Sequence, residues 1–140
     1  MINLCYQDLY QLYVKIINAV PLFEISSINW IVISHNINAD EIKIMNKYNV
    51  KYYSNLDQEK SFYDTISILR NVDGVVSTDT SLPHLSLSLG IKTYVLLTLG
   101  CEWRWLRNDT TNWYPNAILL RQKSLKNWDY PINKLKNILN

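Results

Sequence analysis

The alternation of two kinds of segment along the chain is the feature that most restricts its fold. Short runs rich in β-branched and aromatic residues are typical of buried strands. They occupy residues 28–34, 50–53, 74–77, 93–97 and 117–120. Segments with apolar residues at helical spacing lie between and around them. They occupy residues 6–18, 38–47, 61–69, 82–89 and 131–139. This order predicts an α/β fold, a Rossmann-like parallel sheet with helices on both faces.

Local signals predict where several of these helices begin and end. Asn38 followed three residues later by Glu41 has the pattern of a capping box. Ser61 is predicted to cap the next helix, and Gly90 follows the helix 82–89 as a C′ residue. Proline suits the first turn of a helix, so Pro131 is predicted to begin the last one.

Length and charge restrict the class of protein. With 140 residues, 48% of them hydrophobic, the chain is expected to form a single domain over residues 1–140. A net charge of +2 is too small to indicate a nucleic-acid partner. No apolar run approaches the ~20 residues of a membrane-spanning helix. The first residues lack the pattern of a secretory signal, so a cytoplasmic protein is expected.

The two cysteines, Cys5 and Cys101, are far apart in the sequence and have no Cys-x-x-Cys or His pair beside them. This pattern predicts two ordinary reduced thiols, with neither a disulfide framework nor a zinc site.

The clearest candidate site is the segment 77–84, which runs directly from the end of a predicted strand into the start of a predicted helix. Ligands of open parallel sheets bind beyond the carboxyl ends of the strands. The free N–H groups and the dipole of a helix N-terminus favour a phosphate there. The hydroxyls of Thr80 and Ser81 are further donors, Asp79 is an acceptor for sugar hydroxyls, and His84 is expected to face the same pocket.

A purely structural interpretation of the same residues stays open. Ser and Thr side chains at this position cap helices, and an Asp stabilises the helix dipole. His84 would then be a half-buried histidine whose hydrogen bonds are satisfied within the fold.

Several blocks of residues in a fixed order resemble a known family. They include Asp-Thr at 79–80, His-Leu at 84–85, Leu-Gly at 89–90, Trp-Arg-Trp-Leu at 103–106, Trp-Tyr-Pro at 113–115 and Arg-Gln at 121–122. The chain from residue 30 onward resembles the C-terminal domain of the heptosyltransferase-like family, glycosyltransferase family nine and its relatives. It is most similar to the glycosyltransferase-like domains that follow tetratricopeptide repeats in many bacterial proteins.

This resemblance implies the donor-binding half of a two-domain GT-B glycosyltransferase, which holds a nucleotide-sugar substrate and needs neither a metal nor another cofactor. It implies that Thr80 and Ser81 hold the diphosphate and that Asp79 binds donor-sugar hydroxyls. His84 then contacts the phosphate or the sugar. Preorganised N–H donors stabilise the charge of a leaving nucleoside diphosphate without a cation.

Three further residues are candidates for donor binding. Asp64 and Thr65 open a helix, where they contact the nucleotide or simply cap the helix. Arg104 is expected to reach the diphosphate, since a guanidinium fork suits phosphate. The tryptophans of the same loop either line the nucleotide pocket or form a small core of their own; they are Trp103, Trp105 and Trp113.

The chain also departs from the family pattern. The family opens this domain with a strand, whereas here a helix is predicted from residue 6, so the first strand is expected to be missing. The general base belongs to the acceptor domain of the family, and no catalytic residue is assigned.

Three functions follow as hypotheses. The chain transfers a sugar to a glycan, lipid or protein hydroxyl together with a missing acceptor domain or a second chain. Alternatively, it is a non-catalytic remnant or binding module that retains the fold and binds a partner or itself. The third hypothesis is an unrelated α/β interaction domain.

Overall fold

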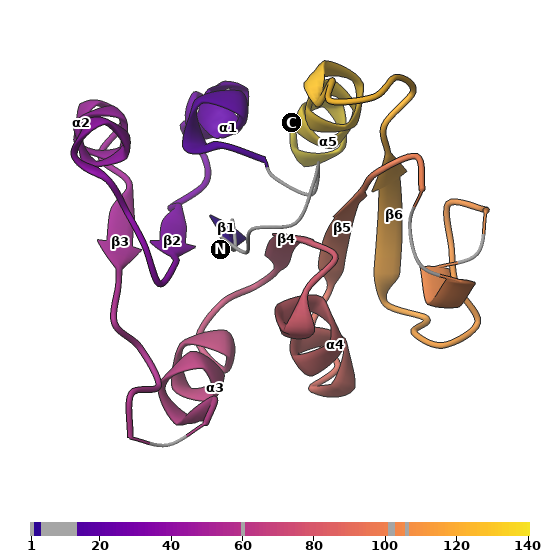
Figure 1. The fold of residues 1–140 in the computed structure, drawn as a ribbon, viewed down its shortest axis with the longest axis horizontal. Coiled ribbons are helices and arrows are strands. Elements are labelled where there is room, and N and C mark those ends of the chain that lie inside the picture. The colour runs from indigo at the N-terminus through magenta and orange to yellow at the C-terminus, as the bar shows by residue number, and fades with distance from the viewer. Residues whose placement is uncertain (1, 4–13, 60, 101–102, 106) are drawn as a thin grey trace.

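The computed structural model describes residues 2–3, 14–59, 61–100, 103–105 and 107–140, and in this part of the chain six parallel strands form one sheet (Figure 1). The strands are β1 (Ile2–Asn3), β2 (Ile31–Ile33), β3 (Lys51–Tyr53), β4 (Val75–Thr78), β5 (Thr93–Leu97) and β6 (Ala117–Arg121). The helices are α1 (Ile16–Phe23), α2 (Ala39–Lys47), α3 (Tyr63–Leu69), α4 (Ser81–Ser88) and α5 (Asp129–Leu139), with a short 3₁₀ helix η1 (Trp103–Trp105).

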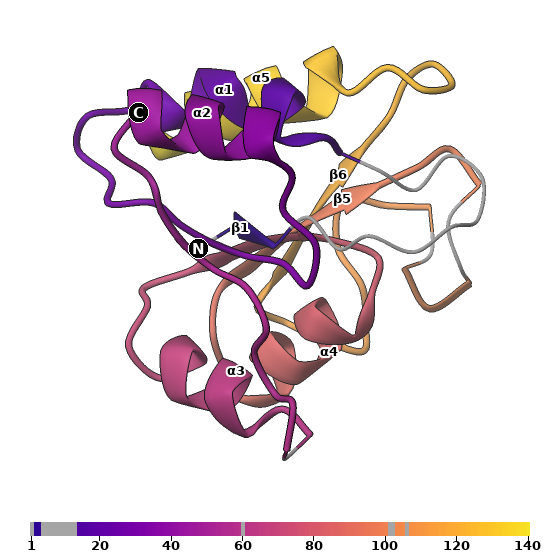
Figure 2. The same cartoon turned by 60° about the vertical axis from the view of Figure 1, so that its left-hand side comes forward.

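The strand order is β3-β2-β1-β4-β5-β6, which is the order of a doubly wound sheet. Helices α1, α2 and α5 cover one face, and α3 and α4 cover the other (Figures 1 and 2). The predicted Rossmann-like α/β fold is therefore confirmed. The chain winds outward in one direction from β1 and in the other from β4, so the topological switch point lies between these two strands.

In β2, β4, β5 and β6, neighbouring residues pack into cores on opposite faces of the sheet, which explains the almost continuous apolar runs of these strands in the sequence. On the face of α1 and α5, the core includes Val32, Val76, Leu96 and Leu120. The residues beside them in the strands pack on the other face; they are Ile33, Val75, Leu97 and Leu119. Because the sheet is buried on both sides, apolar residues are required at consecutive positions.

The expectation that the first strand is missing is wrong. Ile2 pairs with Val32 of β2 and with Val76 of β4, so β1 is the central strand of the sheet. A strand of two residues is too short to give a periodic signal, and Asn3 has a low preference for strands. Pairing on both sides compensates for its shortness.

The first helix also differs from the prediction of residues 6–18. Residues 6–13 lie outside the described part of the chain, and α1 runs from Ile16 through Pro21 to Phe23. The side chain of Asn18 accepts a hydrogen bond from the Lys15 N–H, 3.1 Å away, and so fixes the helix start. Burial of this helix against α5 and α2 outweighs the loss of one backbone hydrogen bond at the proline.

Several predicted helix boundaries are confirmed. The Asn38 side chain accepts hydrogen bonds from the N–H groups of Asp40 and Glu41, and Glu41 accepts one from the Asn38 N–H. Gly90 has φ +78° after α4, as expected of a C′ residue. Two predicted boundaries are wrong. Ser61 does not cap α3, because the helix begins at Tyr63, two residues later. Pro131 does not begin α5 but lies in its first turn, since the helix begins at Asp129.

A segment of the chain lies beside β6 at its outer edge. The Leu119 N–H in the middle of this strand donates to the Asp109 carbonyl, 3.0 Å away. Lys134 of α5 binds the Asp109 carboxylate at 2.8 Å, and this side-chain hydrogen bond raises the pKa of Lys134. The segment 107–111 is therefore fastened to both the sheet and α5.

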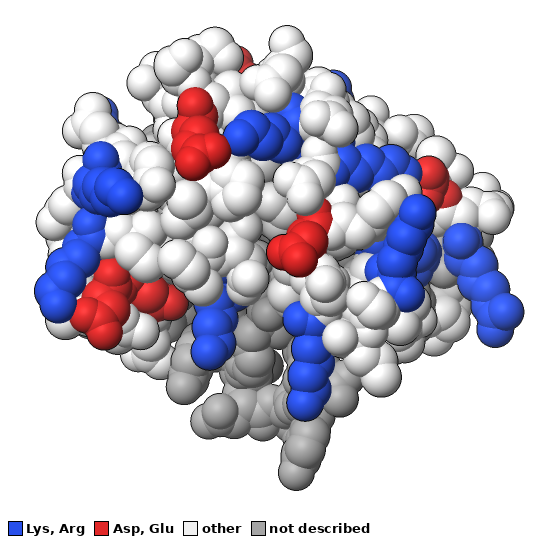
Figure 3. All heavy atoms as spheres, turned by 90° about the horizontal axis from the view of Figure 1, so that it is seen from above, with Lys and Arg blue, Asp and Glu red and all other residues white. Residues whose placement is uncertain are grey.

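Charges of both signs are interspersed on the surface above α1, α2 and α5 (Figure 3). Lysines there form ion pairs with nearby carboxylates; the pairs are Lys43–Asp40, Lys134–Asp109 and Lys136–Glu24. None of the described helices is long and apolar enough to cross a membrane.

Candidate functional site

The turn between β4 and α4 lies at the carboxyl end of a central strand, beside the switch point. Ser77 in β4 is in register with Asn3 of β1. The helices that come next after these two strands, α1 and α4, lie on opposite faces of the sheet, as Figure 2 shows. This is the place where a doubly wound sheet opens a crevice for ligands. Asp79, Thr80 and Ser81 form the turn and the start of α4, where the sequence predicts them.

The N-cap of α4 leaves its backbone donors without a side-chain acceptor. The Thr80 hydroxyl donates to the Thr78 carbonyl at 3.4 Å and lies 3.5 Å from Ser77 Oγ. Among the described residues, Thr80 therefore makes no side-chain capping hydrogen bond to the helix. Pro83 has no N–H, so the donors at this helix start are the N–H groups of Ser81 and Leu82.

Thr78, the last residue of β4, is a buried polar residue with an unsatisfied hydroxyl. It is 2% exposed, and Oγ1 has no hydrogen-bond partner among the described residues. A buried hydroxyl without a partner is destabilising. By alternation along the strand, Thr78 lies on the same face as Val76, the face that α1 covers.

His84 lies on the first turn of α4 and is held by two aromatic side chains. Its Nδ1 is 3.0 Å from the Tyr114 hydroxyl. Its ring stacks on Trp105, with centroids 5.0 Å apart and an angle of 24° between the planes. This geometry agrees with the structural interpretation, in which His84 is half-buried and its hydrogen bonds are satisfied within the fold. The role of His84 in donor binding stays a prediction.

Asp64 and Thr65 are joined to a third residue, Asp57, which the sequence did not single out. Asp57 Oδ1 accepts hydrogen bonds from the Asp64 N–H at 2.7 Å and the Thr65 N–H at 3.3 Å. Its other oxygen accepts the Thr65 hydroxyl, and Asp64 accepts the Asp57 N–H at 2.9 Å. These contacts favour the capping interpretation of Asp64 and Thr65. Asp57 lies seven residues before Asp64, too far for a local pattern to reveal it.

Arg104 lies in η1, which packs against the first turn of α4 because Trp105 stacks on His84. The Arg104 guanidinium carbon is 5.7 Å from the centroid of the Trp103 ring. The structure thus brings Arg104 into the neighbourhood of α4 and places the guanidinium over an indole. The contact of Arg104 with a diphosphate stays a prediction.

The loop that carries η1 is anchored to the end of β6. Arg121 Nη2 donates to the Trp105 carbonyl at 2.7 Å and to the Asn108 carbonyl at 3.3 Å. Trp105 is fully buried, so of the two interpretations of these tryptophans, the small core applies to Trp105. Trp103 and Trp113 differ from it, because they are 66% and 56% exposed.

A polar cavity of about 470 Å³ opens at the carboxyl ends of β2 and β3. Its walls include His35 and Asn36 after β2, and Ser54 and Asn55 after β3. In the strand order, β2 is next to β1 on the side away from β4, and β3 lies beyond β2. The cavity is therefore on the same end of the sheet as the start of α4.

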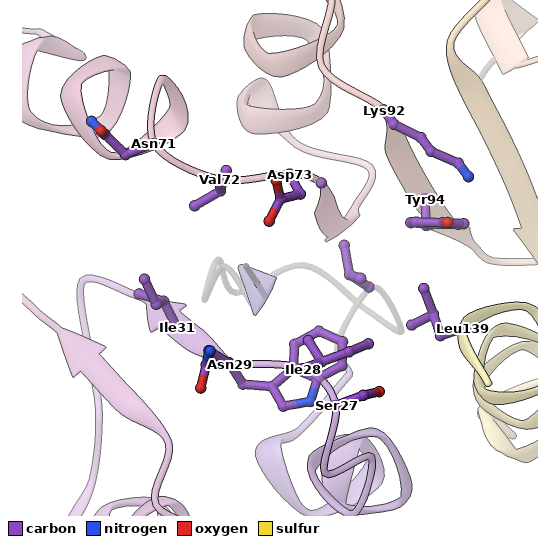
Figure 4. Close-up of a pocket in the computed structure, with 13 residues that line it drawn as sticks. Ser27, Ile28, Asn29, Ile31, Asn71, Val72, Asp73, Lys92, Tyr94 and Leu139 are labelled. Atoms are coloured by element: carbon purple, nitrogen blue, oxygen red, sulfur yellow. The ribbon is translucent and has the colours of Figure 1, made fainter.

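A second cavity, of about 550 Å³, lies at the amino ends of the strands. Figure 4 shows Asp73 and Lys92 on one side of it, opposite Ser27 and Ile28, with Tyr94 beside them. It is at the opposite end of β4 from Asp79 and shares no residue with the β4–α4 turn. The ligand-binding end of a parallel sheet is the carboxyl end, so this cavity is not joined to the candidate site.

Within the described ranges, no three His, Cys, Asp or Glu side chains come together as a possible metal site. Comparison with known proteins adds no assignment: the chain matches no family model, no curated protein and no solved structure.

Proposed function

We propose that this chain is the donor-binding half of a GT-B-type glycosyltransferase and binds the diphosphate of a nucleotide-sugar at the start of α4. The observation that carries the proposal is the uncapped N-terminus of α4 beside the switch point of the doubly wound sheet. The fold and the order of the residue blocks support it together, since the blocks around Asp79 and Arg104 come together in space.

In this proposal the chain stabilises the leaving group. An acceptor hydroxyl oxygen attacks the anomeric carbon of the donor sugar, and the bond from that carbon to the phosphate oxygen breaks. The nucleoside diphosphate leaves with the electron pair, and the acceptor proton passes to a base outside this chain. The N–H groups of Ser81 and Leu82 and the helix dipole stabilise the charge that develops on the phosphate. Asp79, which is half-buried, would accept hydrogen bonds from the donor sugar.

Binding without transfer is the second candidate. The absence of an N–H at Pro83 and the contact of His84 with Tyr114 leave fewer donors at this helix start than a uniform helix offers. These features favour a module that keeps the nucleotide site but has little catalytic power of its own.

The test is a titration of the purified chain with ADP, GDP, UDP and their sugar conjugates in the absence of metal, followed by calorimetry or ligand-observed NMR. We expect saturable binding of one base. Asp79→Ala should weaken the sugar conjugate more than the free diphosphate, because Asp79 is assigned to the sugar. Thr80→Val should weaken both about tenfold or more.

Ser88→Ala is the matched control, since Ser88 is an exposed hydroxyl at the other end of α4. It should bind like the unaltered chain. Circular dichroism of each variant shows that it is folded. If a folded chain binds none of these nucleotides, or if Asp79→Ala and Thr80→Val bind normally, the proposed site is wrong.

A further inference from the structure

Two tryptophans form an exposed pair on the loop between β5 and β6. Trp103 is 66% exposed and Trp113 is 56% exposed. Their ring centroids are 5.6 Å apart, with the planes at 75°, so the edge of one ring meets the face of the other. Exposure of two large aromatic side chains in contact is unusual on a soluble surface and indicates a binding surface.

The pair is held in a fixed arrangement by one buried hydroxyl. Thr111, which is 5% exposed, donates from Oγ1 to the Arg104 carbonyl at 2.8 Å. The same oxygen accepts the Trp113 N–H at 3.3 Å. The backbones that carry the two rings are therefore joined through a single atom, and the Arg104 guanidinium packs on the Trp103 ring. A pair fixed in this way is preorganised for a ligand.

The size of the pair favours a small ligand over a protein partner. At these exposed fractions, the two side chains present roughly 300 Å² of accessible surface. A stable protein interface needs about 800 Å² on each partner. The exposed surface corresponds instead to one or two rings of a small molecule.

The angle between the rings favours a sugar over a nucleobase. A flat base gains most when an aromatic ring lies parallel to it on each side, and two planes at 75° do not allow such a sandwich. A pyranose has an apolar face of C–H bonds and a rim of hydroxyls. Its face packs on one indole, while its hydroxyls accept hydrogen bonds from indole N–H groups.

We propose that Trp103 and Trp113 bind a pyranose ring of a carbohydrate. This site is adjacent to the start of α4, because η1 packs on His84 through Trp105. The inference rests on the proposed function in one respect, that the bound sugar belongs to the transfer reaction. Binding of a free saccharide here requires no nucleotide at α4, so the two proposals are tested separately.

The experiment measures binding of cellotriose, maltotriose and chitotriose to the whole chain by saturation-transfer NMR and tryptophan fluorescence. We expect at least one of them to bind saturably, with transfer to the C–H protons of one sugar face. Trp103→Ala and Trp113→Ala should each weaken this binding about tenfold or more. Leu125→Ala is the control, because Leu125 is 65% exposed and does not belong to the tryptophan pair. This substitution should leave binding unchanged.

Thr111 supplies a second variant that keeps both rings. Thr111→Val should weaken saccharide binding because it releases the two backbones from each other, and Thr111→Ser should restore it. In Trp103→Ala, affinity for nucleoside diphosphates should stay unchanged. The proposal is overturned if no trisaccharide binds, if binding survives loss of both tryptophans, or if a free nucleoside saturates the pair instead.

Discussion

At the scale of single residues, Asp57 shows how one carboxylate fixes a helix start from a distant position. It accepts two backbone N–H groups and one hydroxyl at the beginning of α3, and its own N–H is bound in return by Asp64. Asp57 and Phe62, the residue before α3, both have positive φ, 59° and 61°, a backbone conformation that is uncommon for residues other than glycine.

Replacing Asp57 by alanine should therefore destabilise the protein. We expect Asp57→Ala to lower the free energy of unfolding by about 1–2 kcal/mol, because α3 loses its cap. Urea denaturation measures the change, and Glu59→Ala, which removes an exposed carboxylate of the same loop, should cost less than about 0.5 kcal/mol. Equal effects of the two substitutions would mean that Asp57 does not act as the cap.

The contrast with Asn38 explains which residue-scale features a sequence reveals. Asn38 and Glu41 are three residues apart, and their geometry follows from the helix itself, so the capping box is predictable. The partner of His84, Tyr114, is thirty residues away and depends on how the loop after β5 folds back. The sequence identified the candidate His84 but not the contact that occupies its Nδ1.

At the scale of elements, two glycines have different backbone conformations: Gly90 follows α4, and Gly100 follows β5. Gly90 has φ +78°, and an added Cβ would meet nothing within 4 Å. Gly100 is equally open in space but has no such φ. Alanine substitutions at the two glycines therefore differ in backbone strain but not in steric crowding.

We expect Gly90→Ala to lower the free energy of unfolding by about 1–2 kcal/mol, since a side chain is strained in the left-handed region. Gly100→Ala should change it by less than about 0.5 kcal/mol. Thermal and urea unfolding of both variants measure the difference. If Gly90→Ala proved neutral, the C′ conformation of α4 in solution would differ from that described.

The boundaries of helices and strands show where sequence patterns no longer predict the structure. The strand at residues 93–97 is predicted to the residue, because β-branched and aromatic side chains fill it. By contrast, β1 has only two residues, and its existence follows from the hydrogen bonds that β2 and β4 offer on either side. Helix α1 continues through Pro21 because tertiary packing outweighs the local preference.

At the scale of the whole molecule, one sheet separates two cores, and adjacent residues of β6 belong to different ones. Leu119 packs with Trp105 on one face, and Leu120 packs with Ile132 and Leu135 of α5 on the other. Both leucines are 0% exposed. The alternation of strands and helices predicts such a layered molecule, since it leaves few other arrangements.

Truncation on either face should weaken the entire fold. We expect Leu119→Ala and Leu120→Ala each to lower the free energy of unfolding by about 2–5 kcal/mol, with one cooperative transition in both cases. Tryptophan fluorescence and circular dichroism should give the same midpoint, and the exposed Leu125→Ala should stay within about 0.5 kcal/mol of the unaltered chain. Separate midpoints for the two probes in Leu119→Ala would show that the faces unfold independently.

The segment 107–111 has a consequence for how copies of this chain can meet. It occupies part of the outer edge of β6 through the hydrogen bond from the Leu119 N–H to the Asp109 carbonyl, whereas among the described residues no such bond is made to the outer edge of β3. Exposed strand margins are templates for adding further strands. The edge at β3 is therefore the one to which a second copy would add a strand more readily.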